Sequence, residues 1–368
     1  MSNFLNAANK LKSYSVKIGS VDLIPETIIS LEISHSNKDV IVPGTLVIDD
    51  LYDIALLEDL NVIDVEVVYT DIYDKTFEKT FVILKISEFE TSKNTKMLSI
   101  DLQDKFSYTL ETSFYSKSFT GTAIDALKSY LEHLQLKEVL INDLTSIEEV
   151  VQFTIPQDQN NLISLQNEFR KLGCYFFQNR DSIVIKKLSE MDFSTLPLNG
   201  LYIQQTDNQL YKNIIHDIYV DQANKTNTPP KSRSLAFDIK SKKMVYMETG
   251  DPKLYKIDSN NDNYLQSENG QVDVYQTTLN FDQNEYNIRE KFVSQNSCII
   301  AVNGYIDNGV NQIYDLRIAG NKSSSKLIAD GDLNLNGKWV STKVVDKIVG
   351  DSLVQKITLN RSDKIGKK

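Results

Sequence analysis

The side chains that most often act in catalysis are few and scattered in this sequence. Its three histidines, His35, His133 and His216, lie far apart, and none belongs to an HExxH pattern or another close pair. No GxSxG motif of a serine hydrolase is present either. His133 falls near the end of an expected helix, where a cation complements the helix dipole. We therefore expect an ordinary surface or capping role for His133 and no catalytic histidine.

Two pairs of carboxylates are the candidates for a glycosidase site. They are Glu88 with Glu90, and Asp71 with Asp74. Glycoside hydrolysis does need two acids, one as a proton donor and one as a base or nucleophile. Close acids in strands and loops are, however, usually solvated, so we interpret both pairs as surface positions. No catalytic residue is assigned, and the chain is not expected to be an enzyme.

The nearest approach to a metal site is the polar stretch from 258 to 268. Asp258, Asn260 and Asp262 match the first three oxygen-ligand positions of a calcium loop. Asn263 then stands where the sharp turn needs glycine, and the closing acid, Glu268, comes one residue early. We predict a polar surface loop here, no metal ligand and no cofactor.

A phosphate-binding loop is weakly suggested near the C-terminus. Gly331 and Gly337-Lys338 have almost the right types, but their spacing is one residue too long. Trp339 also replaces the required Ser or Thr. No GxGxxG follows an expected strand, and no alternation of strands and helices indicates a doubly wound sheet. We therefore expect no nucleotide site.

Aromatic residues gather between 106 and 119, with lysines among them. They are Phe106, Tyr108, Phe114, Tyr115 and Phe119, accompanied by Lys105 and Lys117. Bases stack on such residues only within a positively charged groove. Because the chain has 50 acidic and 40 basic residues, with a net charge of −10, we expect core packing or a subunit interface instead.

Composition limits the class of protein. With 368 residues, 41% hydrophobic and 24% charged, the chain is long enough for two or three globular domains, and it is neither disordered nor disulfide-stapled. Its two cysteines, Cys174 and Cys298, form no CxxC pair, so we expect two buried free thiols. No apolar run reaches the roughly 20 residues of a bilayer span, and no signal peptide is recognisable. We expect the chain to be made in a cytoplasm, without stable membrane insertion.

Residues 14–119 are expected to form mostly strands. Ile63, Val65, Val67 and Tyr69 alternate with polar neighbours, and Leu98, Ile100 and Leu102 do the same. Further strands are predicted at 16–23, 28–33 and 82–86, the last covered on both faces for part of its length. Short strands at this spacing favour a closed or nearly closed antiparallel barrel. Residues 4–11 precede it as a short helix or an arm.

The pattern changes near residue 120 to that of an α+β segment. The spacing of Leu127 and Leu131 predicts a helix over 122–134, capped by Thr120 or Thr122. A second helix is predicted over 158–172, with Asp158 at its start and Gly173 at its end. Residues 174–177 and 182–187 then predict a hairpin around the turn 178–181.

The remaining residues return to strands with longer loops. A strand is predicted at 214–220, loops at 224–233 and 258–270, and a short helix between 284 and 294. Alternation returns over the last 70 residues, as in Ile357 and Leu359 against Lys356, Thr358 and Asn360. The predicted fold class is β-rich α+β, and no tandem repeat indicates a solenoid or propeller.

The middle block resembles a known family in the order of its elements. Residues 119–131 (FTGTAIDALKSYL) open a helix, and FTIP at 153–156 leads into a second helix. That helix ends in NEFRKLGCYFF at 167–177 and is followed by IVIK at 183–186. This order is similar to that of the baseplate or tail hub proteins of contractile phages, and of the related late control D and VgrG proteins. The closing stretches 337–345 and 357–361 also resemble the final barrel hairpin of hubs.

The resemblance implies two tube-like antiparallel β-barrel domains with an α+β middle domain. The first barrel is then residues 1–119, the α+β domain 120–190, and the second barrel 191–368 with its long loops. In this family three chains present six barrels in a pseudo-sixfold ring. Such a homotrimer joins the tail tube to the central spike in the virion baseplate and forms part of the DNA conduit. The implied partners are the spike, the tube and neighbouring baseplate proteins.

Three alternatives are kept. A hub of a related secretion or injection device has the same sequence features. A tail-associated adhesin would bind a surface glycan or receptor without a ring, and a wall-degrading enzyme would need acids such as Glu88.

Overall fold

A computed structural model describes the chain over the ranges 10–50, 63–90, 96–114, 116–136, 140–142, 150–155, 160–180, 182–187, 198–203, 213–222, 232–238, 242–249, 296–318 and 337–361. Several predictions fall outside these ranges. They concern most of the N-terminal arm at 4–11, the polar loop at 258–270 and the short helix at 284–294. None of the helices within the described ranges is long and apolar enough to cross a membrane.

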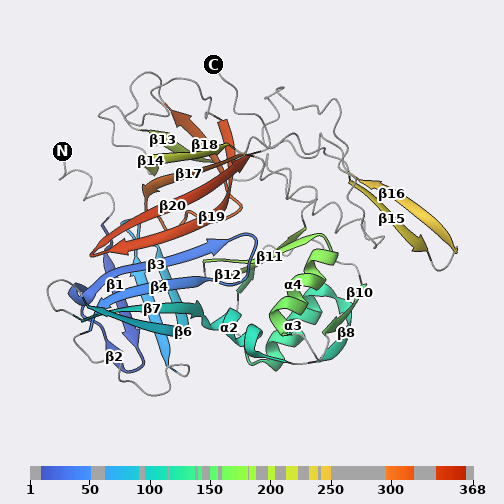
Figure 1. Cartoon of the computed structure of the whole chain (residues 1–368), viewed down its shortest axis with the longest axis horizontal. Helices are drawn as coiled ribbons and strands as arrows, with labels where there is room; N and C mark the ends of the chain where they lie inside the picture. Colours follow the sequence, from blue (N-terminus) through green and yellow to red (C-terminus); the bar gives the residue numbers. More distant parts are fainter. Residues whose placement is uncertain are drawn as a thin grey trace.

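The N-terminal part of the chain is built from strands (Figure 1). They are β1 (Ser13–Ile18), β2 (Val21–Asp22), β3 (Ile28–Ser36), β4 (Pro43–Asp49), β5 (Asp64–Thr70), β6 (Thr76–Glu90) and β7 (Lys96–Asp104), with a 3-10 turn at Pro25–Thr27. The predicted alternation is confirmed, because Val65, Val67 and Tyr69 of β5 are all buried. In β6, Phe81, Val82 and Ile83 are buried in succession, so both faces are covered there. The pairing then shifts between Ile83 and Lys85, and Leu84 at this bulge is exposed.

A short helix that the sequence did not predict follows β7. Helix α2 (Lys105–Thr112) begins after Asp104, whose side chain accepts a hydrogen bond from the Ser107 amide. Phe106 packs inward from this helix, whereas Phe114 beyond its end is two-thirds exposed. Phe106 and Phe114 therefore do not pack together in one core.

The middle segment contains the predicted helices. Its elements are β8 (Lys117–Thr122), α3 (Ala123–His133), β9 (Leu140–Asn142), β10 (Val150–Ile155), α4 (Asn161–Lys171), β11 (Cys174–Asn179) and β12 (Ser182–Lys187). Thr122 caps α3 as predicted. Helix α4 begins later than predicted, at Asn161, and its cap is Asn160 instead of Asp158. Gly173 ends α4 with a φ of 70°, as expected of a left-handed terminator.

The C-terminal part returns to strands. They are β13 (Leu198–Ile203), β14 (Asn213–Gln222), β17 (Asn296–Asn303), β18 (Ile313–Ile318), β19 (Gly337–Val349) and β20 (Ser352–Arg361). A separate two-stranded sheet consists of β15 (Ser232–Asp238) and β16 (Lys243–Thr249). The predicted loop at 224–233 thus ends sooner, because Ser232 and Arg233 belong to β15.

One mostly antiparallel sheet of 13 strands unites the two ends of the chain. Its order is β18-β13-β14-β17-β20-β19-β3-β4-β7-β6-β5-β1-β2. Strand β18 also pairs with β19, so the first six strands of this order close on themselves. The link to the other seven strands is the antiparallel pair β19–β3, in which Val344 lies opposite His35. The fold is therefore β-rich as predicted, and strands from the N-terminal and C-terminal parts of the chain are hydrogen-bonded in one sheet.

Three hydrophobic clusters fill the described part of the molecule, and each draws on distant segments. The cluster inside β1–β7 includes Ile306, Ile348 and Leu353 from the C-terminal part. The cluster inside the closed six-strand ring includes Tyr175 and Phe177 of β11. The third cluster packs α3 and α4 against β11 and β12, together with α2 and Val40. The hairpin β11–β12 thus contributes to two of the three clusters.

Candidate functional site

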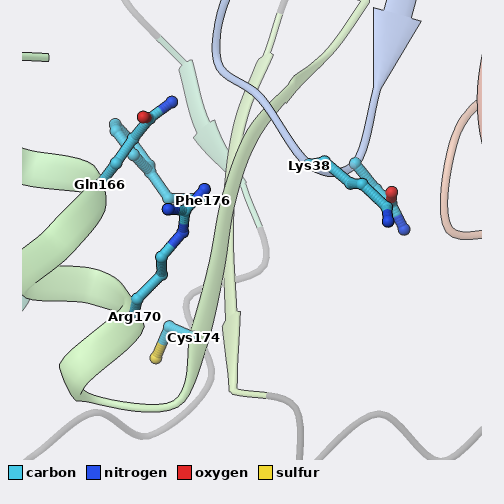
Figure 2. Close-up of a pocket in the computed structure, with 6 residues that line it drawn as sticks. Lys38, Gln166, Arg170, Cys174 and Phe176 are labelled. Carbon is cyan, nitrogen blue, oxygen red and sulfur yellow. The ribbon is translucent and has the colours of Figure 1, made fainter. Parts of the chain in front are cut away.

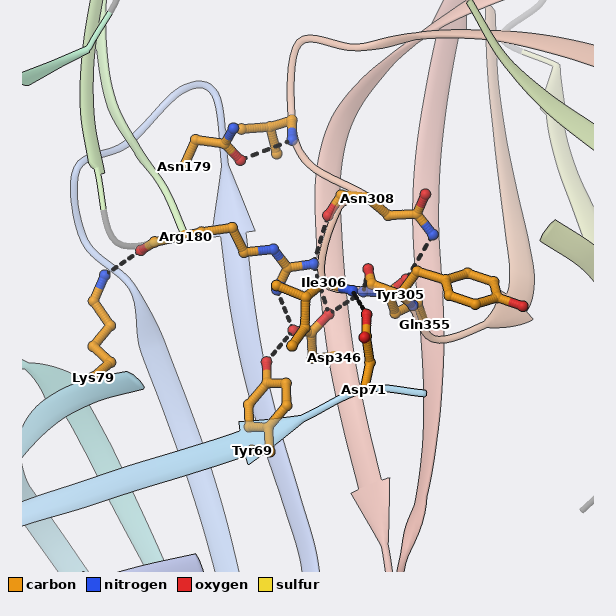
Figure 3. A network of polar contacts seen from close by, with 11 residues as sticks. Tyr69, Asp71, Lys79, Asn179, Arg180, Tyr305, Ile306, Asn308, Asp346 and Gln355 are labelled. Atoms are coloured by element: carbon orange, nitrogen blue, oxygen red, sulfur yellow. Dashed lines mark hydrogen bonds and ion pairs between the residues drawn. The ribbon is translucent and has the colours of Figure 1, made fainter. Parts of the chain in front are cut away.

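The tip of the β11–β12 hairpin carries a buried polar network that joins distant parts of the chain. Arg180 occupies this turn with a φ of 59°, and its side chain is buried. Figure 3 shows the guanidinium reaching from the turn toward β19. There Nη1 forms an ion pair with the carboxylate of Asp346. Nη2 donates to the carbonyl oxygen of Asn308 at 2.5 Å. A residue of the middle segment therefore ends among C-terminal residues.

Asp346 accepts hydrogen bonds from three residues, Tyr69, Arg180 and Gln355. Tyr69 of β5 donates its hydroxyl to Oδ2 at 2.5 Å. Gln355 of β20 donates to Oδ1 at 2.7 Å, and Arg180 Nη2 lies 3.3 Å from the same oxygen. Both carboxylate oxygens thus have two donors, which is about the number that an ionised carboxylate accommodates. This satisfaction is what allows a charged group to be only 1% exposed.

Gln355 ties the network to the loop that follows β17. Its Oε1 accepts from the Tyr305 amide at 2.9 Å and from Asn308 Nδ2 at 2.8 Å. Its Nε2 also donates to the Tyr305 carbonyl at 2.9 Å. The loop 304–308 is therefore fixed against β20 at the position where Arg180 meets the Asn308 carbonyl.

The same hairpin tip is held from the N-terminal strands. Lys79 of β6 donates to Gln178 Oε1 at 2.8 Å and to the Arg180 carbonyl at 2.7 Å. Gln178 in turn donates to Asp104 Oδ2 at 2.7 Å and to the Val40 carbonyl at 2.6 Å. We name the set Tyr69, Lys79, Gln178, Arg180, Asn308, Asp346 and Gln355 the hairpin joint, because it connects all three parts of the chain.

A second contact between the two ends lies beside the hairpin joint. Asp71, in the turn after β5, accepts from the Ile306 amide at 3.1 Å. It also accepts from the amides of Tyr73 and Lys75 in its own turn. Asp71 is only 2% exposed, so its interpretation as a solvated acid was wrong. Its predicted companion Asp74 is exposed and forms an ion pair with Lys12.

Burial controls the protonation of the groups at the joint. Burial raises the pKa of Tyr69 well above its ordinary value, and the adjacent Asp346 charge raises it further. For Arg180, burial is the largest single influence and lowers the pKa, but the charge of Asp346, its hydrogen bond and the neighbouring tyrosines together outweigh burial, so that the pKa is raised. Tyr69 is therefore a neutral donor and Arg180 a permanent cation at any physiological pH.

The arrangement is suited to holding strands together. Its charged atoms face one another, and the main functional atoms are already satisfied by the chain itself. Among the described residues no group of three or more His, Cys, Asp and Glu side chains could hold a metal ion. The hairpin joint therefore fixes the positions of the two strand blocks.

A small pocket lies beside the hairpin, between α4 and β11 (Figure 2). It is lined by Asn37, Lys38, Gln166, Arg170, Cys174 and Phe176. The space open to the centre of a water molecule is about 10 Å³, which is room for roughly one water. Figure 2 shows Arg170 and Gln166 extending from α4, with Lys38 on the other side of the hairpin strands. Such a volume does not accommodate a substrate.

The histidines and cysteines are dispersed, as the sequence indicated. His35 is buried in β3, and His133 is exposed in the last turn of α3. His216 belongs to β14. Cys174 and Cys298 are both buried and free, which confirms the prediction. Glu88 is exposed and pairs with Lys96.

Sequence reasoning missed the residues of the hairpin joint. It placed Arg180 in the 178–181 turn, but nothing marked that cation as buried. The partners Asp346 and Gln355 lie in β19 and β20, more than 160 residues away. A buried cation in a turn can be recognised only once its carboxylate partner is known.

No family model matches this sequence, and no curated protein is similar enough in sequence to be a match. Solved structures are similar in fold. A tail protein from Neisseria meningitidis MC58 superposes with a TM-score of 0.64 at 13% identity, over 95% of this chain and 97% of that one. The 43 kDa tail protein of prophage MuSo2 from Shewanella oneidensis gives 0.66 at 11% identity, over 95% and 98%.

This chain has the fold of phage tail proteins.

The same fold extends to secretion proteins. A chain of the Francisella PdpA–VgrG complex matches with a TM-score of 0.55 at 12% identity. The match covers 98% of this chain but only 55% of that one. The resemblance to tail hub and VgrG proteins is therefore confirmed at the level of fold. For the two tail proteins, the similarity covers nearly the whole of both chains.

Proposed function

We propose that this protein is a structural baseplate hub of a contractile phage tail. The observation that carries the proposal is the near end-to-end match to two phage tail proteins, 95% of this chain against 97% and 98% of theirs. The chain acts as a scaffold, with no catalytic, cofactor or metal residue.

In this proposal the chain contains two tube-like barrels. The six-strand ring closed by the β18–β19 pair supports the second barrel, within residues 191–368. The curved run β3-β4-β7-β6-β5-β1-β2 supports the first, within residues 1–119. Residues 120–190 form the α+β domain between them, and the hairpin joint sets the angle between the barrels.

Three chains then present six barrels in a ring of pseudo-sixfold symmetry. Such a ring has a sixfold face for the tail tube and a threefold face for the central spike, and its opening is part of the DNA conduit. The protein is accordingly a virion component, assembled with neighbouring baseplate proteins in the host cytoplasm. The rigid, satisfied hairpin joint supports this role, because a ring closes only if its units hold a fixed shape.

The test is the mass of the purified chain in solution, measured by light scattering over a range of concentrations. A ring of three 41.9 kDa chains has a mass of about 126 kDa, and this is the expected result. Electron microscopy of that species should show a threefold ring. A monomer at every concentration, also after mixing with tube and spike proteins, would refute the trimeric hub.

A hub of a secretion or injection device is the second candidate. It is favoured by the similarity to the Francisella PdpA–VgrG complex. It is also favoured by an E. coli protein described as a type VI secretion component, which matches with a TM-score of 0.50 over 98% of this chain. Mass spectrometry of purified particles separates the two: a phage hub is found in DNA-filled virions, and a secretion hub in particles without DNA.

A further inference from the structure

His35 is a buried histidine, and its surroundings are unusual. It lies in β3, beside the β19–β3 pair, and is 1% exposed. The ring meets Phe77 edge-on, with centroids 5.9 Å apart. Neither Nδ1 nor Nε2 has a hydrogen-bond partner among the described residues. A neutral imidazole tolerates such an apolar site far better than an imidazolium does.

The charges that face His35 are mainly cationic. Arg180 of the hairpin tip and Lys79 of β6 both act on the ring electrostatically. On the other side of Phe77, Tyr69 of β5 stacks on that ring at 4.8 Å. On β3 itself, Glu32 is already paired with Lys347 of β19 at 2.5 Å.

The nearby anion has no capacity left for another donor. Both oxygens of Asp346 are occupied by Arg180, Tyr69 and Gln355. Asp104, a buried carboxylate bonded to Gln178 of the joint, accepts from Gln178, from the Ser107 amide and from the Val42 amide. A proton added to His35 therefore introduces a buried positive charge that only a rearrangement of the joint can satisfy.

We propose that His35 makes the hairpin joint acid-sensitive, so that protonation of its imidazole beside Arg180 and Lys79 releases the β11–β12 tip from the two strand blocks. This inference concerns the single chain and does not depend on the proposed hub function. In neutral solution the imidazole of His35 is uncharged and packs in the core against Phe77. In acid the imidazole takes up a proton only after the hairpin tip has moved away and the ring has reached solvent.

The sign of the effect follows from linkage. Burial first, and then the charges of Arg180 and Lys79, hold the pKa of His35 well below its ordinary value of 6.5. Above pH 6.5 both the folded and the unfolded chain have a neutral His35, so stability does not change with this group. Below pH 6.5 only the unfolded chain takes the proton, so stability falls as the pH falls. One proton changes the unfolding equilibrium constant by up to about tenfold per pH unit.

The first experiment is urea unfolding of the full chain between about pH 5 and pH 7.5, the range in which histidine titrates. Trp339 is the only tryptophan of the chain, is fully buried and lies in β19, so its fluorescence reports on the fold. We compare the native chain with His35→Phe and with the matched control His133→Phe, whose histidine is exposed. The native chain and the control should lose stability below pH 6.5. For each pH unit of acidification, their unfolding equilibrium constant should rise by up to about tenfold more than that of His35→Phe. Equal slopes in all three would overturn the proposal.

Two further measurements locate the effect and protect the test against a variant that does not fold. In the native chain, the NMR signal of the His35 ring should not titrate while the chain is folded, and His133→Phe and His216→Phe identify the other two signals. Hydrogen exchange, corrected for its intrinsic pH dependence, should rise first at 174–187 in acid, before α3 responds. A His35 signal that titrates near pH 6.5 in the folded chain, or exchange that rises uniformly, would contradict the proposal.

Discussion

Lys79 donates its ammonium to the backbone carbonyl of Arg180 at 2.7 Å, while the guanidinium of that same arginine pairs with Asp346. One turn is thus held by its backbone from the N-terminal strands and by its side chain from the C-terminal strands. A displacement of either block breaks a charge-assisted hydrogen bond in a buried place. The relative position of the two blocks is therefore set by a hairpin that belongs to neither.

Removing the cation of the hairpin joint should be costly. Arg180→Met leaves the buried Asp346 without its counter-charge, and we expect a loss of about 3–5 kcal/mol in the free energy of unfolding. Urea denaturation measures this. The double variant Arg180→Met/Asp346→Leu should recover part of the loss, because no charge is then left unpaired.

A matched control for this prediction is available in β19, next to Asp346. Lys347 is about 41% exposed and pairs with Glu32 on the surface of β19–β3. Lys347→Met should change stability by no more than about 1 kcal/mol. Equal losses for Arg180→Met and Lys347→Met would show that the hairpin joint contributes no more than a surface pair.

The buried face of α3 gives a second prediction. Leu127 is completely buried, so Leu127→Asp places an unpaired charge in the cluster between α3, α4 and the hairpin. The expected cost is about 4 kcal/mol or more, or failure to fold. The exposed neighbour Lys128 is the control, and Lys128→Asp should stay within about 0.5 kcal/mol. Unchanged thermal stability of Leu127→Asp would be incompatible with this packing.

Gly304 is a third test, at the start of the loop held by Gln355. A Cβ at this position would lie 2.1 Å from Leu353 Cγ and 2.8 Å from the Leu353 carbonyl oxygen. Gly304→Ala should therefore destabilise the chain by about 1–3 kcal/mol. Gly350 has a φ of 60°, and a Cβ added there would have no heavy atom within 4 Å. Gly350→Asn should cost less than about 1 kcal/mol, because asparagine tolerates that conformation.

Chelation tests the sequence interpretation of residues 258–268. Because Asn263 and the early Glu268 depart from a calcium loop, EDTA should leave the melting temperature unchanged. The same sample with added calcium is the control. A large decrease with EDTA that calcium reverses would assign a metal to this loop.

Local patterns in the sequence predicted the local parts of the fold. The spacing of Leu127 and Leu131 and the hydroxyl of Thr122 located α3 almost to the residue, and Gly173 located the end of α4. These features depend on neighbours within one or two turns. Helix α2 was missed because eight residues give little periodicity, and the only signal was Asp104 three residues before Ser107.

Long-range relationships could not be predicted in this way. The pairing of Val344 with His35, and the burial of Arg180 against Asp346, join residues separated by more than 160 positions. A charged residue in a turn looks like any solvated residue until its partner is known. Asp71 was misinterpreted for the same reason, because the amide that it binds belongs to Ile306.

The β19–β3 pair also has a consequence for synthesis. The ribosome delivers β3 roughly 300 residues before β19, and Ile348 and Leu353, which complete the N-terminal core, emerge with it. Until then β3 has a free edge and its cluster is incomplete, a state prone to pairing with other nascent chains. A premature stop after residue 340 would leave that edge permanently open. Such products should aggregate or be degraded, so that only full-length translation yields a usable molecule.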